Sequence, residues 1–263
     1  MRVRATVAYD GSGFAGFQRQ RNARTVQGEI ETALERVLGR RTPILASGRT
    51  DTGVHATGQV IAFDLAGWQH PLALLVRALN ATLPADIAVR ALQPCAPDFH
   101  PRYNALSRTY EYTIYVDPVR HPLRRHTAWW LCQKPDVVRM NQAAAYLLGE
   151  HDFAAFGRAT SEHEDASTVR RVLRAEWREV AADELRFVIE ANAFLYHMVR
   201  RVVKALVNVG LGLNQPEDVK AMLEGKDAQR IKGLAPACGL CLVHVKYPGE
   251  TSHEAHPNLL RNA

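Results

Sequence analysis

The chain has 263 residues, of which 47% are hydrophobic, and this is enough for one large domain or two of ordinary size. No apolar stretch approaches the roughly 18 residues of a membrane-spanning helix, and the opening residues lack the apolar core of a secretory signal, so we expect a cytoplasmic protein. The formal net charge is +6 and Arg greatly outnumbers Lys, which favours a polyanionic partner because guanidinium groups pair with phosphate and stack on bases.

The first hundred residues predict alternating strands and helices. Residues 2–9 alternate apolar and polar side chains, as a half-buried strand does, and DGSG after them predicts a turn. A helix is expected over 25–39, because Thr25 provides a cap, apolar residues recur at helical spacing and Gly39 ends the pattern. The other elements expected here are a short strand near 43–47, a strand over 59–65, a helix over 71–84 and a strand over 86–92.

The second half predicts the same mixture of elements. Residues 107–116 predict an aromatic strand with Arg108, Tyr110, Tyr112 and Ile114 on one face. Two later strands, joined by a tight Ala-Asp turn, predict a hairpin. The remaining expectations are the hairpin strands over 172–180 and 184–191, helices over 135–149, 194–210 and 215–225, a last strand over 239–247 and a frayed tail.

The irregular alternation of helices and strands predicts an α+β fold rather than a doubly wound parallel one. We expect two similar domains, each a mainly antiparallel sheet with helices packed on one face. The Pro-rich stretch QPCAPDFHPRYNA (93–105) indicates the boundary between them. The expected division is an N-terminal domain over 1–100, a C-terminal domain over 101–248 and a flexible tail over 249–263.

The segment GRTDTGVHA (48–56) places one carboxylate, Asp51, between Arg49 and His55 in a glycine-bounded bend. DTG is also the tripeptide of aspartic proteases, but those enzymes need two carboxylates that share a proton, and this chain has one DTG. From these residues alone, a capping aspartate in a tight turn and a catalytic carboxylate both remain open.

Motifs for metal or phosphate binding are weak. CGLC (238–241) is a single CxxC within an expected strand, where the two thiols would point to opposite faces, and neither HExxH nor a paired CxxC occurs. Four scattered cysteines indicate reduced thiols rather than a disulfide framework. DGSGFAG (10–16) is glycine-rich but lacks the Lys-Ser/Thr of a phosphate-binding Walker loop. We therefore expect no metal site.

Basic residues gather in three places along the chain. Each group alone is typical of a solvated face, but three groups with aromatic residues nearby indicate a nucleic-acid surface. The groups are Arg19, Arg21 and Arg24; the loop RHPLRRH (120–126); and His197, Arg200, Arg201 and Lys204 on one side of the 194–210 helix, with Phe17, Tyr103 and Tyr110 interleaved.

Six segments together resemble the tRNA pseudouridine synthase family that modifies nucleotides 38 to 40 in the anticodon stem-loop. They run in order over nearly the whole chain, which makes the resemblance highly specific. The segments are YDGSGFAGFQRQ (9–20), GRTDTGVHA (48–56), FHPRYNALSRTYEY (99–112), GEHDFAAFGRA (149–159), ANAFLYHMVRRVV (191–203) and APACGLCLVHVKYP (235–248).

The resemblance implies a role for individual residues. Asp51 is expected to be the nucleophile, Arg49 to organise its loop, Tyr110 to contact the target uracil and Leu240 to pack against the base. It also implies a homodimer, the absence of a cofactor and one sheet continuous across both domains. The chain departs from the common family pattern at Phe17, Thr52, Ala193, Cys238 and Cys241, which leaves the fine choice of substrate less certain than the activity.

Isomerisation of uridine suits a chain without redox, phosphate or metal motifs. The carboxylate of Asp51 either attacks or stabilises C1′ of the ribose or takes a proton from the sugar, and the sequence does not choose among these. A nearby Arg49 would favour its charged form, and we expect Arg49 to pair with Asp51 rather than to fill the space left by an extruded base. Tyr110 is expected to stack on uracil and to help remove the C5 proton. The alternative is a non-catalytic RNA-binding or tRNA-chaperone protein of the same fold.

Overall fold

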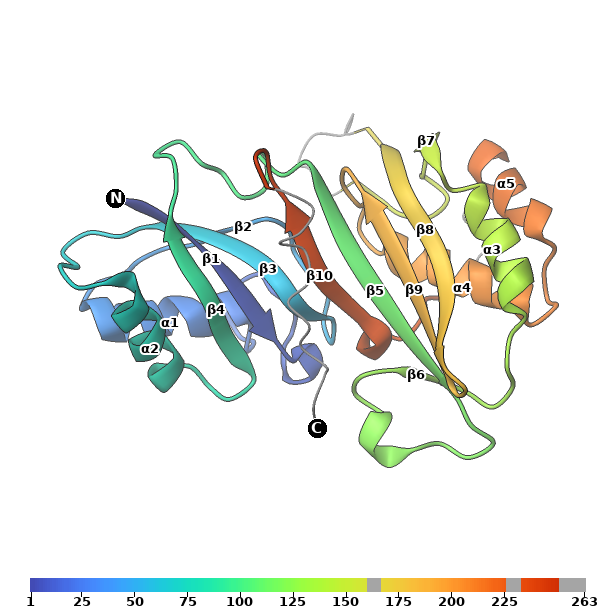
Figure 1. The fold of residues 1–263 in the computed structure, drawn as a ribbon, viewed down its shortest axis with the longest axis horizontal. Helices are drawn as coiled ribbons and strands as arrows, with labels where there is room; N and C mark the ends of the chain where they lie inside the picture. The colour runs from blue at the N-terminus through green and yellow to red at the C-terminus, as the bar shows by residue number, and fades with distance from the viewer. Residues whose placement is uncertain (160–166, 226–232, 251–263) are drawn as a thin grey trace.

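The computed structural model describes residues 1–159, 167–225 and 233–250. Within them, ten strands form one sheet with the order β4-β1-β3-β10-β5-β9-β8-β7, while β2 pairs with β3 and β6 pairs with β5 (Figure 1). The strands are β1 (Arg2–Tyr9), β2 (Leu45–Ala46), β3 (His55–Asp64), β4 (Ile87–Pro94), β5 (Ser107–Val116), β6 (Trp129–Leu131), β7 (Gly149–Asp152), β8 (Val169–Ala181), β9 (Glu184–Ala191) and β10 (Leu240–Lys246).

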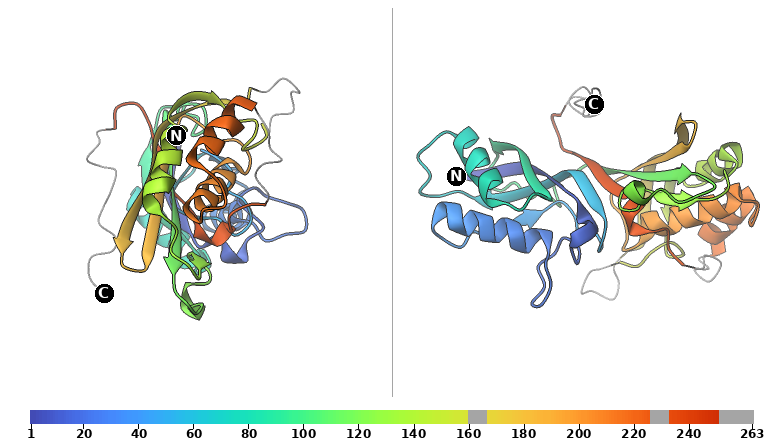
Figure 2. Two further views of the ribbon diagram at one scale, coloured as in Figure 1. Left: turned by 90° about the vertical axis from the view of Figure 1, so that its right-hand side faces the viewer. Right: turned by 90° about the horizontal axis from the view of Figure 1, so that it is seen from below.

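Five α-helices accompany the sheet in the described part of the chain. Figure 2 shows α1 and α4 on the same side of the sheet, at its two ends. The helices are α1 (Val26–Leu38), α2 (Leu72–Thr82), α3 (Val137–Ala145), α4 (Met198–Gly210) and α5 (Pro216–Gly225), and the short 3₁₀ helices are η1 (Gly11–Gly13), η2 (Pro122–Arg124) and η4 (Ala237–Gly239).

The expected fold class is confirmed: this is an α+β protein with a mainly antiparallel sheet that runs through both halves. Most neighbouring strands pair in antiparallel fashion, whereas β10 pairs in parallel with β3 and β6 in parallel with β5. Strand β10 is the last strand of the described residues but lies between β3 and β5 (Figure 1). Strand β10 therefore joins the first half of the sheet to the second.

Buried side chains form two hydrophobic clusters, one for each half of the sheet. Leu242, Val245 and Tyr247 of β10 and its end belong to the N-terminal cluster, whereas Leu240 belongs to the C-terminal one. One strand thus contributes to both cores, and the division of the chain near residue 100 stays a prediction. Of the expected flexible tail, residues 251–263 lie outside the described residues.

Local signals explain why the elements begin and end where they do. The hydroxyl of Thr25 accepts a hydrogen bond from Gly28 N at 3.3 Å at the start of α1, and Gly39 ends this helix in the left-handed conformation at φ 68°. In the described residues, no helix is long and apolar enough to cross a membrane.

Three sequence-based expectations need correction. Strand β3 begins at His55 rather than 59, because Ala56 already pairs with Tyr9 of β1. Helix α4 begins at Met198 rather than 194, because His197 has a positive φ of 65° that no helix continues through. Cys238 lies in η4 rather than in the strand with Cys241, and burial raises the pKa of both thiols, that of Cys241 to about 11.

The short strands β6 and β7 were not expected at all. β6 has three residues and β7 has four, too few to show an alternating pattern in the sequence.

Candidate active site

A cleft of about 710 Å³ contains Asp51 and collects residues from distant parts of the chain. Its described lining comes from the first loops of the N-terminal half, the connection before β5, the segment before α4 and the start of β10. Among these residues, Asp51 is the single acid and five are arginines. The arginines are Arg49, Arg102, Arg108, Arg170 and Arg200.

The loop that carries Asp51 is a tight turn fixed by backbone contacts. Val54 N donates to Asp51 O at 3.1 Å, and Phe17 N donates to Thr50 O at 3.1 Å. Gly16 has φ +87°, and a Cβ there would lie 3.0 Å from Thr50 O. A glycine is needed at this position both for its backbone conformation and because the backbone segments at residues 16 and 50 approach each other closely.

Buried polar side chains hold this loop in place through hydrogen bonds. The Tyr9 hydroxyl shares a hydrogen bond of 2.8 Å with Thr50 Oγ1, and Gln59 Nε2 donates to Gly48 O at 3.0 Å. Ser47 Oγ donates to Gln59 Oε1 at 2.6 Å, and both side chains are buried. Because buried polar groups are costly when unpaired, this network favours one conformation of the loop.

Arg108 connects the Asp51 loop to two other segments. Its guanidinium donates to Ser47 O at 3.1 Å, to Arg102 O at 2.5 Å and to Asn192 O at 2.8 Å. Burial lowers the pKa of Arg108, and within the described residues this cation pairs with carbonyl oxygens and with no carboxylate. Arg108 thus holds the loop, the connection between the halves and the segment that leads to α4 in one arrangement.

The carboxylate of Asp51 is paired with the first turn of α4. Arg200 Nη1 lies 3.2 Å from Asp51 Oδ2, and Arg200 Nε also donates to Ala235 O at 2.9 Å. His197 Nε2 lies 3.5 Å from the same Oδ2. Side-chain exposure is only 15% for Arg200 and 20% for Asp51, so this charge-assisted contact is largely shielded from water.

The expected pairing of Arg49 with Asp51 is wrong. Arg49 is exposed, and in the described part of the chain it forms neither a hydrogen bond nor an ion pair, although it lines the cleft. The cation beside the carboxylate is Arg200, a residue of the basic helix side expected to bind RNA.

His197 occupies an unusual backbone conformation next to the carboxylate. Its φ is 65°, and among the described residues no other non-glycine residue has a positive φ. Such backbone strain is often found at functional sites. Burial and the guanidinium groups of Arg200 and Arg201 lower the pKa of His197, although the Asp51 carboxylate opposes this shift. The imidazole is therefore uncharged at neutral pH, and Arg200 is the cation that balances Asp51.

Aromatic and apolar side chains form the wall near Asp51. The ring of Tyr110 meets that of Phe194 nearly perpendicularly, with centroids 5.1 Å apart, and Leu240 is buried in the same cleft. Burial and the Asp51 carboxylate raise the pKa of Tyr110 well above its usual range. The phenol therefore keeps its proton at neutral pH, which disfavours Tyr110 as a phenolate base and leaves its ring and neutral hydroxyl for contact.

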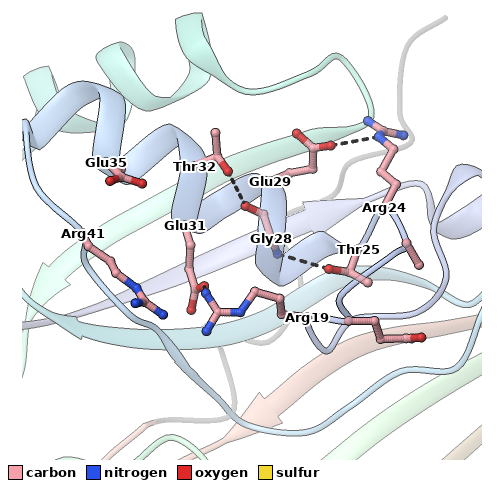
Figure 3. Close-up of a pocket in the computed structure, with 11 residues that line it drawn as sticks. Arg19, Arg24, Thr25, Gly28, Glu29, Glu31, Thr32, Glu35 and Arg41 are labelled. Atoms are coloured by element: carbon pink, nitrogen blue, oxygen red, sulfur yellow. Dashed lines mark hydrogen bonds and ion pairs between the residues drawn. The ribbon is translucent and has the colours of Figure 1, made fainter.

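The arginines before α1 are mostly paired within the fold. Arg19 contacts Glu31 at 2.7 Å, and Arg24 contacts Asp86 at 2.7 Å and Glu29 at 3.0 Å. Figure 3 shows Arg19 and Arg24 beside α1. Both arginines line a hollow of about 270 Å³. Its described lining holds three arginines (Arg19, Arg24 and Arg41) and three acids (Glu29, Glu31 and Glu35).

The other residues expected to bind RNA are found in different surroundings. Arg21 is exposed. Arg201 is half-buried and donates to Ala155 O at 3.4 Å, and Lys204 Nζ lies over the Trp129 ring at 5.5 Å from its centroid. Phe17 is 2% exposed and packs in the N-terminal core, so the surface role expected for it is wrong.

Sequence reasoning missed the roles of Arg108, Gln59 and His197. Arg108 shares a strand face with Tyr110, which was a usable signal, because a charged residue on an otherwise apolar face needs a partner. Neither Gln59 nor His197 stands out in this way from the residues around it. Their partners in the fold lie elsewhere in the sequence.

Comparison with known proteins identifies the family to which this sequence is similar. The sequence profile of the family described as tRNA pseudouridine synthase matches residues 5–104 and 143–248. The chain is 41% identical to a tRNA pseudouridine synthase A of Fervidobacterium nodosum, over 94% of this chain and 99% of that protein. It is 42% identical to the protein of that name from a Geobacter species, over 94% and 98%, and 41% identical to that of Bacillus subtilis, over 94% and 99%.

Proposed function

The chain belongs to the tRNA pseudouridine synthase family, and from this premise we propose that it isomerises uridine at nucleotides 38, 39 and 40 of the anticodon stem-loop, with Asp51 as the essential carboxylate. Family membership makes the protein an isomerase that acts on uridine in tRNA. The positions within the tRNA and the role of Asp51 are the proposal.

The observation that carries the role of Asp51 is its position as the single acid among five arginines in the described lining of the cleft. Guanidinium groups without carboxylate partners attract phosphate, so the cleft suits an RNA backbone. A lone carboxylate in such a place opposes the binding of a polyanion, which indicates that it is there for chemistry. Its fixed loop and its contact with Arg200 at 3.2 Å support the same role.

The reaction breaks the N1–C1′ bond, turns the uracil and joins C5 to C1′, after which the C5 proton leaves. Asp51 either attacks or stabilises the electron-poor C1′ or takes a proton from the sugar, and each route begins with an ionised carboxylate. The guanidinium of Arg200 donates to Asp51 Oδ2 and holds this oxygen in place. Neither hydride nor phosphate is transferred, so the reaction is redox-neutral.

A target uridine that is paired in the stem must turn out of it, at a cost of roughly a few kcal/mol. Stacking of a base on an aromatic ring contributes ~1–3 kcal/mol, and we assign this contact to Tyr110, with Leu240 packing against the base. We assign Arg49 to the RNA rather than to Asp51, since it is exposed at the edge of the cleft.

Five arginines are expected from the sequence to bind RNA: Arg19, Arg21, Arg24, Arg200 and Arg201. Of these, Arg21 keeps that proposed role, because it is exposed and forms no ion pair within the described residues. We further propose that the protein acts in the cytoplasm as a homodimer without a cofactor. Light scattering on the purified chain tests the dimer, since a mass near 29.3 kDa would indicate a monomer instead.

The experiment that tests the function uses tRNA with tritium at C5 of uridine. We expect release of tritium and pseudouridine at nucleotides 38, 39 and 40 wherever uridine occurs there. Full binding of tRNA without release would indicate a non-catalytic RNA-binding protein of the same fold. Release with pseudouridine at other positions would keep the activity and overturn the proposed sites.

A further inference from the structure

We propose that Tyr103, backed by His100, is a stacking platform for a second RNA base, a neighbour in the RNA of the uridine that reacts. The inference rests on the proposed function, because the ligand is the RNA that enters the Asp51 cleft. Three residues that line this cleft form what we call the Tyr103 platform: Tyr103, His100 and Arg102.

Tyr103 is an aromatic residue that the fold leaves open. Its exposure is 75%, whereas Tyr9 and Tyr112 are 4% and 0% exposed. One face of the Tyr103 ring meets the His100 ring, with centroids 4.3 Å apart and planes inclined by 37°. Within the described residues its hydroxyl has no hydrogen-bond partner, and at 75% exposure the residue is open to a flat ligand.

The loop that carries Tyr103 is held in place by its neighbours. His100 N donates to Asn104 Oδ1 at 2.6 Å, and Asn104 N donates to His100 O at 3.0 Å. Tyr247 Oη donates to Pro101 O at 2.7 Å, and Arg108 donates to Arg102 O at 2.5 Å. The ring is therefore presented from a fixed loop, and little conformational freedom is lost when a ligand stacks on it.

The ring behind Tyr103 is an uncharged imidazole. Arg102 N donates to His100 Nδ1 at 3.2 Å, so this nitrogen carries a lone pair and no proton. Burial and the nearby guanidinium groups of Arg2 and Arg102 lower the pKa of His100. A neutral imidazole behind a phenol ring gives an extended aromatic surface, which is the usual feature of a site that stacks a base without selecting its sequence.

The guanidinium of Arg102 lies over the Tyr103 ring, and that of Arg170 is close enough to Arg102 for the two charges to interact. The guanidinium carbon of Arg102 lies 5.8 Å from the Tyr103 centroid. Burial and Arg102 both lower the pKa of Arg170, which also lines the cleft. In the described part of the chain, neither arginine has a carboxylate partner, and the two cations repel each other. A phosphate between them would relieve this repulsion, so a nucleotide provides both the base and the anion that the site needs.

The cleft has room for this second nucleotide. Its volume of about 710 Å³ is in the range that encloses a drug-sized molecule, which is more than one pyrimidine ring. The wall beside Asp51 already has an aromatic contact for the reacting base in Tyr110, which meets Phe194 and not Tyr103. The two aromatic sites in one cleft therefore serve two bases.

The test is a double-mutant cycle between the protein and the RNA, measured as tRNA affinity. All proteins carry Asp51→Asn, so that chemistry does not disturb binding. Tyr103→Ala is combined with tRNAs in which one nucleotide of the anticodon stem-loop at a time is made abasic. Tyr103→Phe keeps the ring, and Tyr146→Ala removes a half-buried tyrosine outside the described lining of the cleft.

We expect Tyr103→Ala to weaken binding roughly 5- to 150-fold, which corresponds to 1–3 kcal/mol per stacked base at 1.4 kcal/mol per tenfold change. Tyr103→Phe and Tyr146→Ala should stay within about threefold. At one position, the abasic nucleotide should lower the tRNA affinity of the protein that carries Asp51→Asn alone. The same abasic nucleotide should not lower the affinity of the Tyr103→Ala variant any further. Unchanged affinity of Tyr103→Ala, equal losses for Phe and Ala, or additive losses at every abasic position would each overturn the proposal.

This test separates the platform from the proposed function. Pseudouridine formation is measured on the protein with Asp51 intact, whereas the cycle measures binding alone. If the wild-type chain makes no pseudouridine but the coupling is found, the platform stands and the function fails. If pseudouridine forms and no coupling is found, the platform fails and the function stands.

Discussion

The chain gathers arginines at two hollows that differ in charge balance. In their described linings, the Asp51 cleft has five arginines and one acid, whereas the hollow beside α1 has three of each (Figure 3). Beside α1, Arg19 and Arg24 are satisfied by Glu31, Glu29 and Asp86. In the cleft, most of the positive charge has no acidic partner and needs an anion from outside. An arginine cluster thus indicates a nucleic-acid site only when the fold leaves its charge unpaired.

The largest effect is expected from Asp51→Asn, which keeps the shape of the side chain and removes its charge. Tritium release should fall by about 10³-fold or more, because the group that reacts is lost. Binding of tRNA should stay within about tenfold, since affinity comes mainly from phosphate contacts. Asp86→Asn removes the partner of Arg24 beside α1 and is the matched control, with activity near that of the wild type. Normal turnover of Asp51→Asn would remove the carboxylate from the mechanism.

Replacing Arg200 should affect turnover more than binding, because its charge is already balanced by Asp51. We expect Arg200→Met to lower kcat by about 10²-fold, as loss of one charged donor at a reacting group typically does. Arg200→Lys should recover part of this loss. The slope of tRNA affinity against salt should change little. A flattened salt dependence with unchanged kcat would place Arg200 on the RNA backbone instead.

The unpaired arginines of the cleft should control the salt dependence of binding. Arg102→Gln and Arg170→Gln should each lower the slope of log affinity against log salt by about 0.9, the value for one phosphate contact. Arg19→Gln and Arg24→Gln should leave this slope unchanged, because acids of the fold already balance them. Equal slopes for both pairs would remove the distinction between the two hollows.

The smallest effect is expected from Arg24→Met, and it concerns stability. Arg24 joins Glu29 and Asp86 and lies over the Phe14 ring at 4.2 Å, but its side chain is 39% exposed. Solvent screens such pairs, so we expect the free energy of unfolding to fall by about 0.5–1 kcal/mol. Urea unfolding measures this change, and tRNA turnover should be unaffected. A large loss of tRNA binding at full stability would make the hollow an RNA site.

Elements with a regular pattern could be predicted from the sequence, and those set by single backbone conformations could not. The caps at Thr25 and Gly39 give α1 within one residue at each end. The apolar residues 194 and 195 continue the spacing of α4, but they precede it, because the positive φ of His197 lies between them and the helix. Periodicity does not reveal such a residue.

The site shows the same limit. Asp51 could be identified from its motif and from the resemblance, but its partner could not. Arg49 is two positions away and exposed, whereas Arg200 is 149 positions away and in contact. Only the sheet, in which β10 lies between β3 and β5, places the two halves so that the first turn of α4 meets the Asp51 loop.

Photocrosslinking gives the most direct test that the target nucleotide enters the Asp51 cleft. A tRNA with 5-bromouridine at nucleotide 38, 39 or 40 is irradiated on the protein, and the crosslinked residues are identified by mass spectrometry. We expect crosslinks to Tyr110 or to the segments 48–52 and 193–200 that line the cleft. Crosslinks confined to the hollow beside α1, within residues 19–41, would contradict this account.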